Sequence, residues 1–125
     1  MPNKALIVDD QADIRKLIMM TMESEDFELH QAENGEDAWR MAQSLRPAVV
    51  LLDVMMPGSL DGYQVCEKIK ADPTLQKITK VILLTARGQR TDIEHGQSVG
   101  CDAYLVKPFS PIELLDTVER LVARA

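Results

Sequence analysis

The sequence has little of what marks a secreted, zinc-binding or membrane protein. Its two cysteines, Cys66 and Cys101, lie far apart and form no CxxC pair, which favours a reduced protein over a disulfide scaffold. The two histidines, His30 and His95, lack the spacing of metal ligands. No apolar run approaches the roughly 18 residues of a membrane span, and the N-terminal run is too short for a signal peptide. We therefore expect a cytoplasmic location.

An excess of basic residues is also missing. Lys and Arg number 14 against 20 Asp and Glu, so the formal net charge is -6. Direct nucleic-acid binding and docking to an anionic membrane both need a basic face, and neither is expected here. The length of 125 residues and the hydrophobic fraction of 46% instead predict one domain over residues 1–125, with a core that needs no disulfide or metal.

Short apolar runs recur along the chain and predict β-strands. Four of them are continuous, which is typical of strands buried on both faces of a parallel sheet. These runs span residues 5–8, 48–52, 81–84 and 103–106. A fifth run, 27–32, alternates apolar and polar side chains and predicts an edge strand.

Amphipathic segments follow each of these runs and predict helices. Helical spacing of apolar residues extends over 14–22, 38–45, 62–71 and 114–122. Asn34, Thr91 and Ser110 each suit a helix N-cap, and Gly96 should make the helix that follows Thr91 short. Five successive strand–helix pairs predict an α/β fold, in which helices cover both faces of a parallel sheet.

Polar side chains stand where the predicted strands end. Asp9 and Asp10 follow the first strand and Asp53 ends the third, whereas Thr85 and Lys107 follow the fourth and fifth. The carboxyl ends of parallel strands share one edge of a sheet, where ligands bind. Two carboxylates about 4 Å apart repel by about 4 kcal/mol at an effective dielectric near 20. A Mg²⁺ ion would relieve this repulsion, because it prefers carboxylate oxygens, and Lys107 adds a second positive charge.

Five motifs make the chain resemble the receiver domain of two-component response regulators, in particular the single-domain type of the chemotaxis regulators. In chain order they read LIVDD, VVLLDVMMPG, DGYQV, VILLTA and YLVKPF, and the resemblance extends over the whole chain. It implies a flavodoxin-like (βα)5 fold, with a five-stranded parallel sheet in the strand order 2-1-3-4-5. It also implies a phosphorylation-dependent switch that catalyses only its own phosphorylation and a slow autodephosphorylation.

The resemblance assigns the phosphorylation and metal sites. Asp53 looks like the aspartate that accepts a phosphoryl group from a phosphohistidine donor. Asp10, Asp53 and the backbone carbonyl of Met55 would bind Mg²⁺ directly, and Asp9 would bind it through water.

The resemblance also assigns the phosphoryl contacts and the switch. The Thr85 hydroxyl, the Ala86 backbone N–H and Lys107 would hold the phosphoryl oxygens, and the Lys107-Pro108 bond is expected to be cis. Tyr104 looks like an aromatic switch that turns inward when Thr85 moves. The face made by the fourth helix, the fifth strand and the fifth helix would then change.

Two features depart from the family pattern. Gly58, Ser59 and Leu60 separate Pro57 from Asp61-Gly62, which is one residue more than usual beside the metal site. Gln11 stands where the family often has a third acidic residue. Met55 and Arg87 also flank the expected path of the attacking water, and an apolar Met55 would slow hydrolysis of the aspartyl phosphate.

Three other functions fit parts of the sequence. A haloacid-dehalogenase-like phosphatase also uses an aspartate nucleophile and Mg²⁺, but needs a second Asp where this chain has Met55. A flavodoxin-like FMN carrier needs hydroxyl or glycine donors in place of Asp9 and Asp10. A degenerate receiver would act only as a docking module, which the complete set of site residues disfavours.

The expected partners follow from the resemblance. They are a sensor histidine kinase or a histidine phosphotransfer protein, and a downstream protein or a fused output domain. The chain would be a monomer that can dimerise through the fourth helix, fifth strand and fifth helix on phosphorylation. Whether it is a stand-alone receiver or part of a longer protein stays open.

Overall fold

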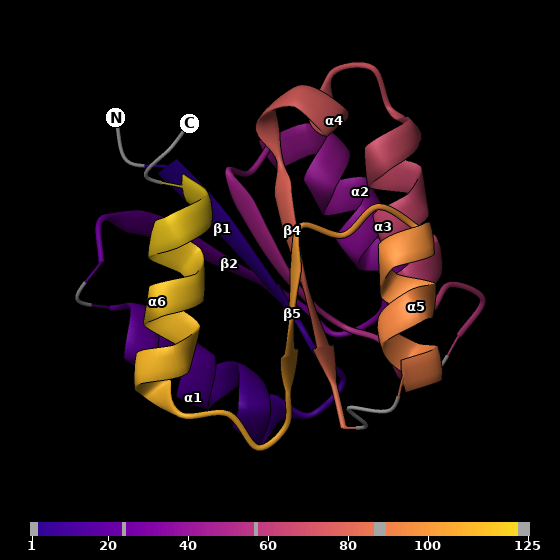
Figure 1. Cartoon of the computed structure of the whole chain (residues 1–125). Helices are drawn as coiled ribbons and strands as arrows, with labels where there is room; N and C mark the ends of the chain where they lie inside the picture. Colours follow the sequence, from indigo (N-terminus) through magenta and orange to yellow (C-terminus); the bar gives the residue numbers. More distant parts are fainter. Residues whose placement is uncertain (1–2, 24, 57, 87–89, 123–125) are drawn as a thin grey trace.

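In the part of the chain that the structure describes, five strands are followed in turn by helices, with two helices in succession after the third strand (Figure 1). The computed structural model describes residues 3–23, 25–56, 58–86 and 90–122, except for the side chains of 90–93. The elements are β1 (Asn3–Val8), α1 (Ala12–Met22), β2 (Phe27–Ala32), α2 (Gly35–Leu45), β3 (Val49–Asp53), α3 (Gly62–Ala71), α4 (Leu75–Ile78), β4 (Lys80–Thr85), α5 (Arg90–Ser98), β5 (Ala103–Val106) and α6 (Pro111–Val122). The fourth and fifth helices expected from the sequence are thus α5 and α6.

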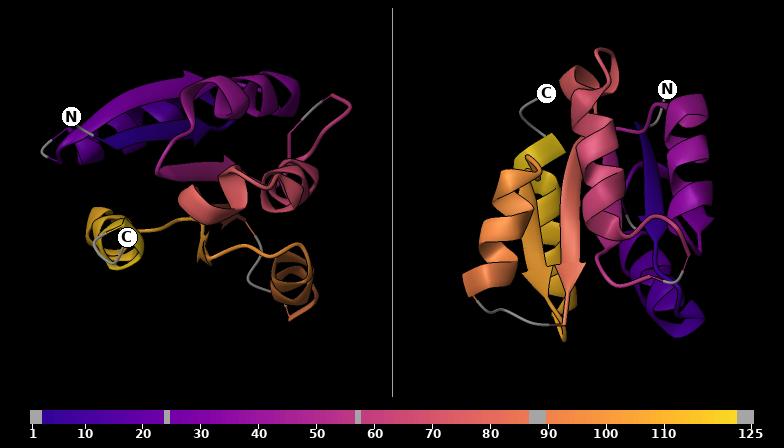
Figure 2. Two further views of the ribbon diagram at one scale, coloured as in Figure 1. Left: turned by 90° about the horizontal axis from the view of Figure 1, so that it is seen from above. Right: turned by 90° about the vertical axis from the view of Figure 1, so that its right-hand side faces the viewer.

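The strands form one parallel sheet in the order β2-β1-β3-β4-β5. Figures 1 and 2 show helices on both faces of this sheet, with α1 and α6 on one side and α2, α3 and α5 on the other. A separate apolar cluster fills the space under each helical layer. The predicted α/β architecture, the strand order 2-1-3-4-5 and the position of β2 at an edge are confirmed.

Two expectations about burial and helix count are wrong. β5 was expected to be buried on both faces, yet Val106 is 40% exposed. The strand is the second edge of the sheet, as the expected strand order requires. A short helix, α4, lies between α3 and β4, where none was predicted. Its four residues are too few to show a helical period. The turn that leads into it is held locally, because the Asp72 carboxylate accepts the N–H groups of Thr74 and Leu75.

The predicted helix caps are confirmed at two of three positions. The Asn34 side chain accepts the backbone N–H of Asp37, and Ser110 and Glu113 form a reciprocal capping box. Thr91 lies within the bounds of α5, and its side chain is outside the described part of the structure. Gly96 proves to have a packing role, since a Cβ there would lie 3.2 Å from Leu83 Cδ1 on β4. No helix of the described residues is long and apolar enough to cross a bilayer.

Candidate functional site

The register of the sheet brings the strand-end residues together. Val8 on β1 pairs with Leu52 on β3, so Asp9 lies beside Asp53. On the other side of β3, Asp53 itself pairs with Leu84 on β4. All these positions lie at the carboxyl edge of the sheet, where the sequence predicted the site.

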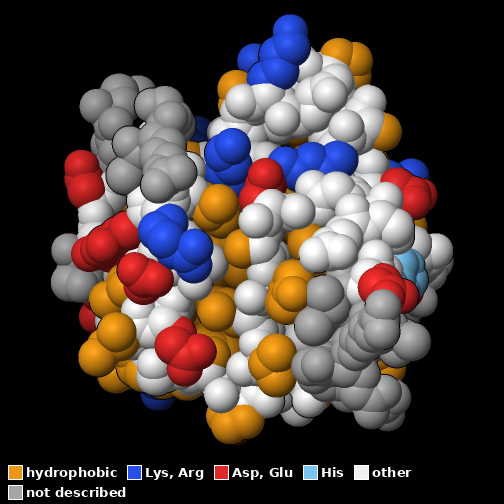
Figure 3. Space-filling model, viewed as in Figure 1, with side chains coloured by type: hydrophobic (Ala, Val, Ile, Leu, Met, Phe, Trp, Pro, Cys, Tyr) orange, Lys and Arg blue, Asp and Glu red, His pale blue; other side chains and the backbone are white. Residues whose placement is uncertain are grey.

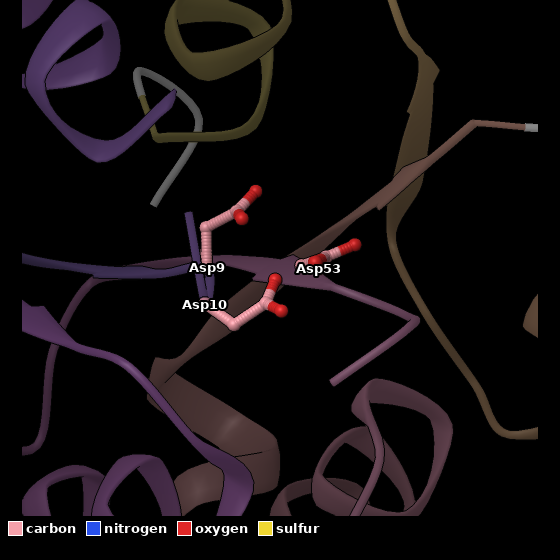
Figure 4. Close-up of side chains that lie close together, drawn as sticks. All are labelled: Asp9, Asp10 and Asp53. Atoms are coloured by element: carbon pink, nitrogen blue, oxygen red, sulfur yellow. The ribbon is translucent and has the colours of Figure 1, made fainter. Parts of the chain in front are cut away.

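Three carboxylates gather at this edge. Asp9, Asp10 and Asp53 each offer a carboxylate oxygen, and these atoms all lie within 4.8 Å of one another. Figure 4 shows the three side chains close together, with the carboxylates of Asp9 and Asp10 above and below that of Asp53 in this view. Asp9 is fully buried and Asp53 is 5% exposed, whereas Asp10 faces solvent. Such a cluster of hard oxygen donors, open on one side to water, fits Mg²⁺.

Lys107 balances the two buried carboxylates. Its Nζ lies 2.8 Å from Asp9 Oδ2 and 3.4 Å from Asp53 Oδ1. The other oxygen of Asp9 accepts the Gln11 backbone N–H at 2.9 Å. Both oxygens of Asp9 therefore already have partners, which supports an indirect contact of Asp9 with a metal. Asp10 and Asp53 keep more of their coordination capacity.

The buried position of Asp53 changes its acidity. Burial, followed by the charge of Asp9, raises the pKa of the Asp53 carboxyl from 3.8 to about 6. The Lys107 ammonium and the Met55 backbone N–H, which lies 3.3 Å from Asp53 Oδ1, act in the opposite direction. Asp53 is thus an ionised, poorly solvated carboxylate near neutral pH, and such a carboxylate is a stronger nucleophile than one in water.

Thr85 and Tyr104 lie on one face of the sheet. Tyr104 pairs with Leu83, and Thr85 follows Leu83 by two positions on β4, so all three side chains point to the same side. Tyr104 is partly buried against the cluster that packs on α2, α3 and α5. Thr85 is buried and Ala86 is exposed. A change at Thr85 can therefore reach Tyr104 without crossing the sheet.

The β3–α3 loop (residues 54–56 and 58–61 of those described) borders the carboxylates. The Met55 side chain is 72% exposed, and the Gly62 N–H closes the loop on the Val54 carbonyl at 3.2 Å. A Cβ at Gly62 would overlap the Asp53 carbonyl oxygen, so glycine is needed there. The expected cis bond between Lys107 and Pro108 is confirmed. Arg87 and Pro57 lie outside the described residues.

Three supporting contacts were not predicted. The Arg15 guanidinium donates to the Asp9 carbonyl oxygen at 2.7 Å, and Asp61 and Gln64 form a capping box at the start of α3. The Glu36 carboxylate binds the tip of the β3–α3 loop. The spacing of Asp61 and Gln64 was readable from the sequence. The other two contacts join residues on separate elements, and no local pattern indicates them.

Comparisons with known proteins agree with this geometry. Residues 5–119 match the family described as "Response regulator receiver domain". The chain is 44% identical over 124 residues to the transcriptional regulatory protein SrrA of Staphylococcus aureus, covering 99% of this chain and 49% of SrrA. The chain thus spans about half the length of this curated relative.

Solved structures are similar over nearly the whole chain. A putative response regulator from Chloroflexus aurantiacus has a TM-score of 0.92 at 31% identity, covering 99% of this chain and all of the other. The receiver domain of the sensor histidine kinase PA1611 from Pseudomonas aeruginosa has a TM-score of 0.88 at 28% identity, covering 98% and 99%. That structure contains a magnesium ion in its active-site cleft.

Proposed function

Because the chain belongs to the response regulator receiver domain family, we propose that Asp53 accepts a phosphoryl group and that the new charge switches the α5–β5–α6 face. The observation that carries this proposal is the setting of Asp53: a buried carboxylate with two aspartates beside it and the Lys107 ammonium 3.4 Å from its Oδ1. The whole of residues 1–125 would act as one receiver domain.

Mg²⁺ is the cofactor that this donor set fits. Asp10, Asp53 and the Met55 backbone carbonyl would hold it directly, and Asp9 through water. When bound, the ion supplies positive charge that offsets the negative charge of the phosphoryl oxygens. Members of this family bind Mg²⁺ at an acidic aspartate cluster, and the magnesium in the PA1611 receiver supports the same assignment here.

The transfer uses the residues at the strand ends. A carboxylate oxygen of Asp53 attacks phosphorus, the bond from phosphorus to the donor imidazole breaks, and the imidazole keeps that electron pair. Lys107 moves from the aspartates to a phosphoryl oxygen, while the Thr85 hydroxyl and the Ala86 N–H donate hydrogen bonds to the other oxygens. Hydrolysis of the aspartyl phosphate later returns Asp53 to its starting state.

The α5–β5–α6 face is the surface that would respond. Thr85 moves toward the phosphoryl group, and Tyr104 turns into the space that Thr85 leaves. Figure 3 shows hydrophobic side chains gathered between α6 and α5, over β5. Ile112 on α6 is 80% exposed and Val106 on β5 is 40% exposed, so this face offers apolar contacts to a partner.

The partners follow from this mechanism. A sensor histidine kinase or a histidine phosphotransfer protein would supply the phosphoryl group in the cytoplasm. A separate protein or a fused output domain would read the α5–β5–α6 face. The domain would be a monomer that can dimerise through this face on phosphorylation, with no direct binding of nucleic acid. It acts on no substrate other than its own phosphoryl donor.

Acetyl phosphate tests the central claim. With Mg²⁺ present, we expect the wild type to gain one phosphoryl group and Asp53→Asn to gain none, because the amide cannot act as the nucleophile. Intact-protein mass spectrometry measures both. A wild type without adduct, or an undiminished adduct on Asp53→Asn, would contradict the proposal.

Replacing Met55 with asparagine should shorten the life of the phosphorylated state severalfold. Met55 is 72% exposed beside Asp53 and offers an attacking water only a weak sulfur acceptor and no donor, whereas an asparagine amide can orient one. The decay of purified phosphoprotein, followed by intact mass, gives the rate. Met55→Leu is the matched control and should decay like the wild type, and an equal rate for Met55→Asn would refute this role of Met55.

A further inference from the structure

One carboxylate on α2 holds the tip of the β3–α3 loop. Glu36 is the second residue of α2, and its Oε1 accepts the Ser59 hydroxyl and the Leu60 backbone N–H, each at 2.8 Å. Hydrogen bonds to an ionised carboxylate are stronger than those between neutral groups. These two bonds, that of Ser59 first, lower the pKa of Glu36, so its carboxylate stays charged throughout the neutral range.

The loop backbone is shaped around this contact. Gly58 has a φ of 106°, and a Cβ there would lie 2.9 Å from Glu36 Oε2. Glycine therefore allows both the left-handed conformation and the close approach of the loop to the carboxylate. Gly35 makes a second close approach, because a Cβ there would overlap the carbonyl oxygen of Leu60. The loop tip and the start of α2 thus fit together along their backbones.

The same loop carries a proposed metal ligand. Its first residues are held near Asp53 by the Met55 N–H and by the buried Met56 side chain. Its tip is exposed at Gly58 and Ser59. The hydrogen bonds from Ser59 and Leu60 to Glu36 restrain the position of this tip. The tip is also where the chain has one residue more than the family pattern. A longer loop has more conformations to lose when a ligand orders it.

We propose that Glu36 is a positioning residue for Mg²⁺: it restrains the β3–α3 loop and thereby presents the Met55 carbonyl to the ion. This inference rests on the proposed function, since it takes that carbonyl as a ligand. Residues that orient metal ligands without touching the metal typically contribute tenfold or more to affinity. Without Glu36, binding of Mg²⁺ must order the loop and becomes weaker.

Titration with MgCl₂, followed by two-dimensional NMR of the backbone amides, tests this role. The dissociation constant of Glu36→Ala should rise about tenfold over that of the wild type. The dissociation constant of Ser59→Ala should rise less than that of Glu36→Ala, because the Leu60 N–H still donates to the Glu36 carboxylate. Glu36→Gln keeps an acceptor oxygen of the same shape and should restore most of the affinity. Glu33→Ala removes an equal charge from an exposed residue just before α2 and should bind like the wild type.

A second readout needs no metal. Hydrogen exchange of the amides of residues 58–60 should speed up in Glu36→Ala and not in Glu33→Ala, in metal-free buffer. Unaltered exchange, or an affinity of Glu36→Ala equal to that of the wild type, would overturn the positioning role. The positioning role would also be overturned if Glu36→Gln or Glu33→Ala lost as much Mg²⁺ affinity as Glu36→Ala, because loss of negative charge alone would then explain the effect. A wild type whose Asp10 and Asp53 amides do not respond to Mg²⁺ would instead contradict the proposed function.

Discussion

Asparagine in place of Asp53 should make the metal-free protein more stable at pH 7.5, by about 3 kcal/mol. The pKa of Asp53 rises from 3.8 to about 6 on folding, which is a shift of about two units, and each unit corresponds to about 1.4 kcal/mol. Its cause is first the burial of the carboxylate and then the charge of Asp9. An amide at this position has no charge to desolvate. The residue proposed to react is therefore one that weakens the fold.

The pH dependence of this gain has a definite sign. The pKa of Asp53 is higher in the folded than in the unfolded protein. Its contribution to the free energy of unfolding is therefore fully favourable below about pH 4 and is lost as the pH rises through about 6. The stability difference between Asp53→Asn and the wild type should therefore open between about pH 4 and 6 and stay constant above pH 7. Urea unfolding at pH 5.0, 6.0 and 7.5 measures it.

Control measurements separate this effect from general charge removal. Asp26→Asn changes the same charge at an exposed residue outside the carboxylate cluster and should show no such pH-dependent gain. Added MgCl₂ should stabilise the wild type more than Asp53→Asn, because the ion binds the folded state through the carboxylates. An Asp53→Asn protein less stable than the wild type at pH 7.5 would show that burial of this carboxylate is not costly.

Methionine in place of Lys107 should destabilise the metal-free protein by about 3 kcal/mol at pH 7.5. Lys107 Nζ lies 2.8 Å from Asp9, which is fully buried, and 3.4 Å from Asp53. Methionine keeps the apolar stem but leaves two buried carboxylates that repel each other. Loss of one partner of a buried ion pair typically costs about 3–5 kcal/mol, and uptake of one proton by the pair limits the cost here.

The destabilisation by Lys107→Met should be smaller at acidic pH, and smaller when Asp53 is replaced as well. Protonation of one carboxylate removes the repulsion, so the stability gap between Lys107→Met and the wild type should narrow as the pH falls from 7.5 to 5.0. In an Asp53→Asn background the same substitution should cost less, because only Asp9 is left unpaired. Lys16→Met, at an exposed position on α1, is the control. Equal losses in both backgrounds would show that Lys107 does not couple to Asp53.

Most of the architecture was predictable from local patterns. The apolar runs that became β1, β3 and β4 are buried along nearly their whole length, and Asn34 and Ser110 cap the helices they were expected to cap. These features depend on side chains a few residues apart, so a local pattern is enough to indicate them. The set of strand-end residues was predictable for a related reason, because parallel strands end at one edge whatever their order.

Features that depend on strand order were harder to predict. The run 103–106 is as apolar as the inner strands, yet β5 is less buried than they are, because it lies at an edge of the sheet. The capping box of Asp61 and Gln64 was overlooked although its spacing is local. The contact of Glu36 with Ser59 crosses 23 positions of sequence, and only the packing of α2 beside α3 brings the two together.

The two adjacent aspartates show where sequence information ends. Charge, spacing and the apolar runs were enough to indicate the α/β class, a cluster of carboxylates and a cation to match it, and the resemblance to receiver domains added the strand order. They could not indicate that Asp9 is fully buried and bound to Lys107, 98 positions away, while Asp10 faces solvent. Burial and ion pairing depend on which strands become neighbours and on how each strand end turns into its loop. The nucleophile's acidity and the restraint on the loop beside it therefore arise only in the folded chain.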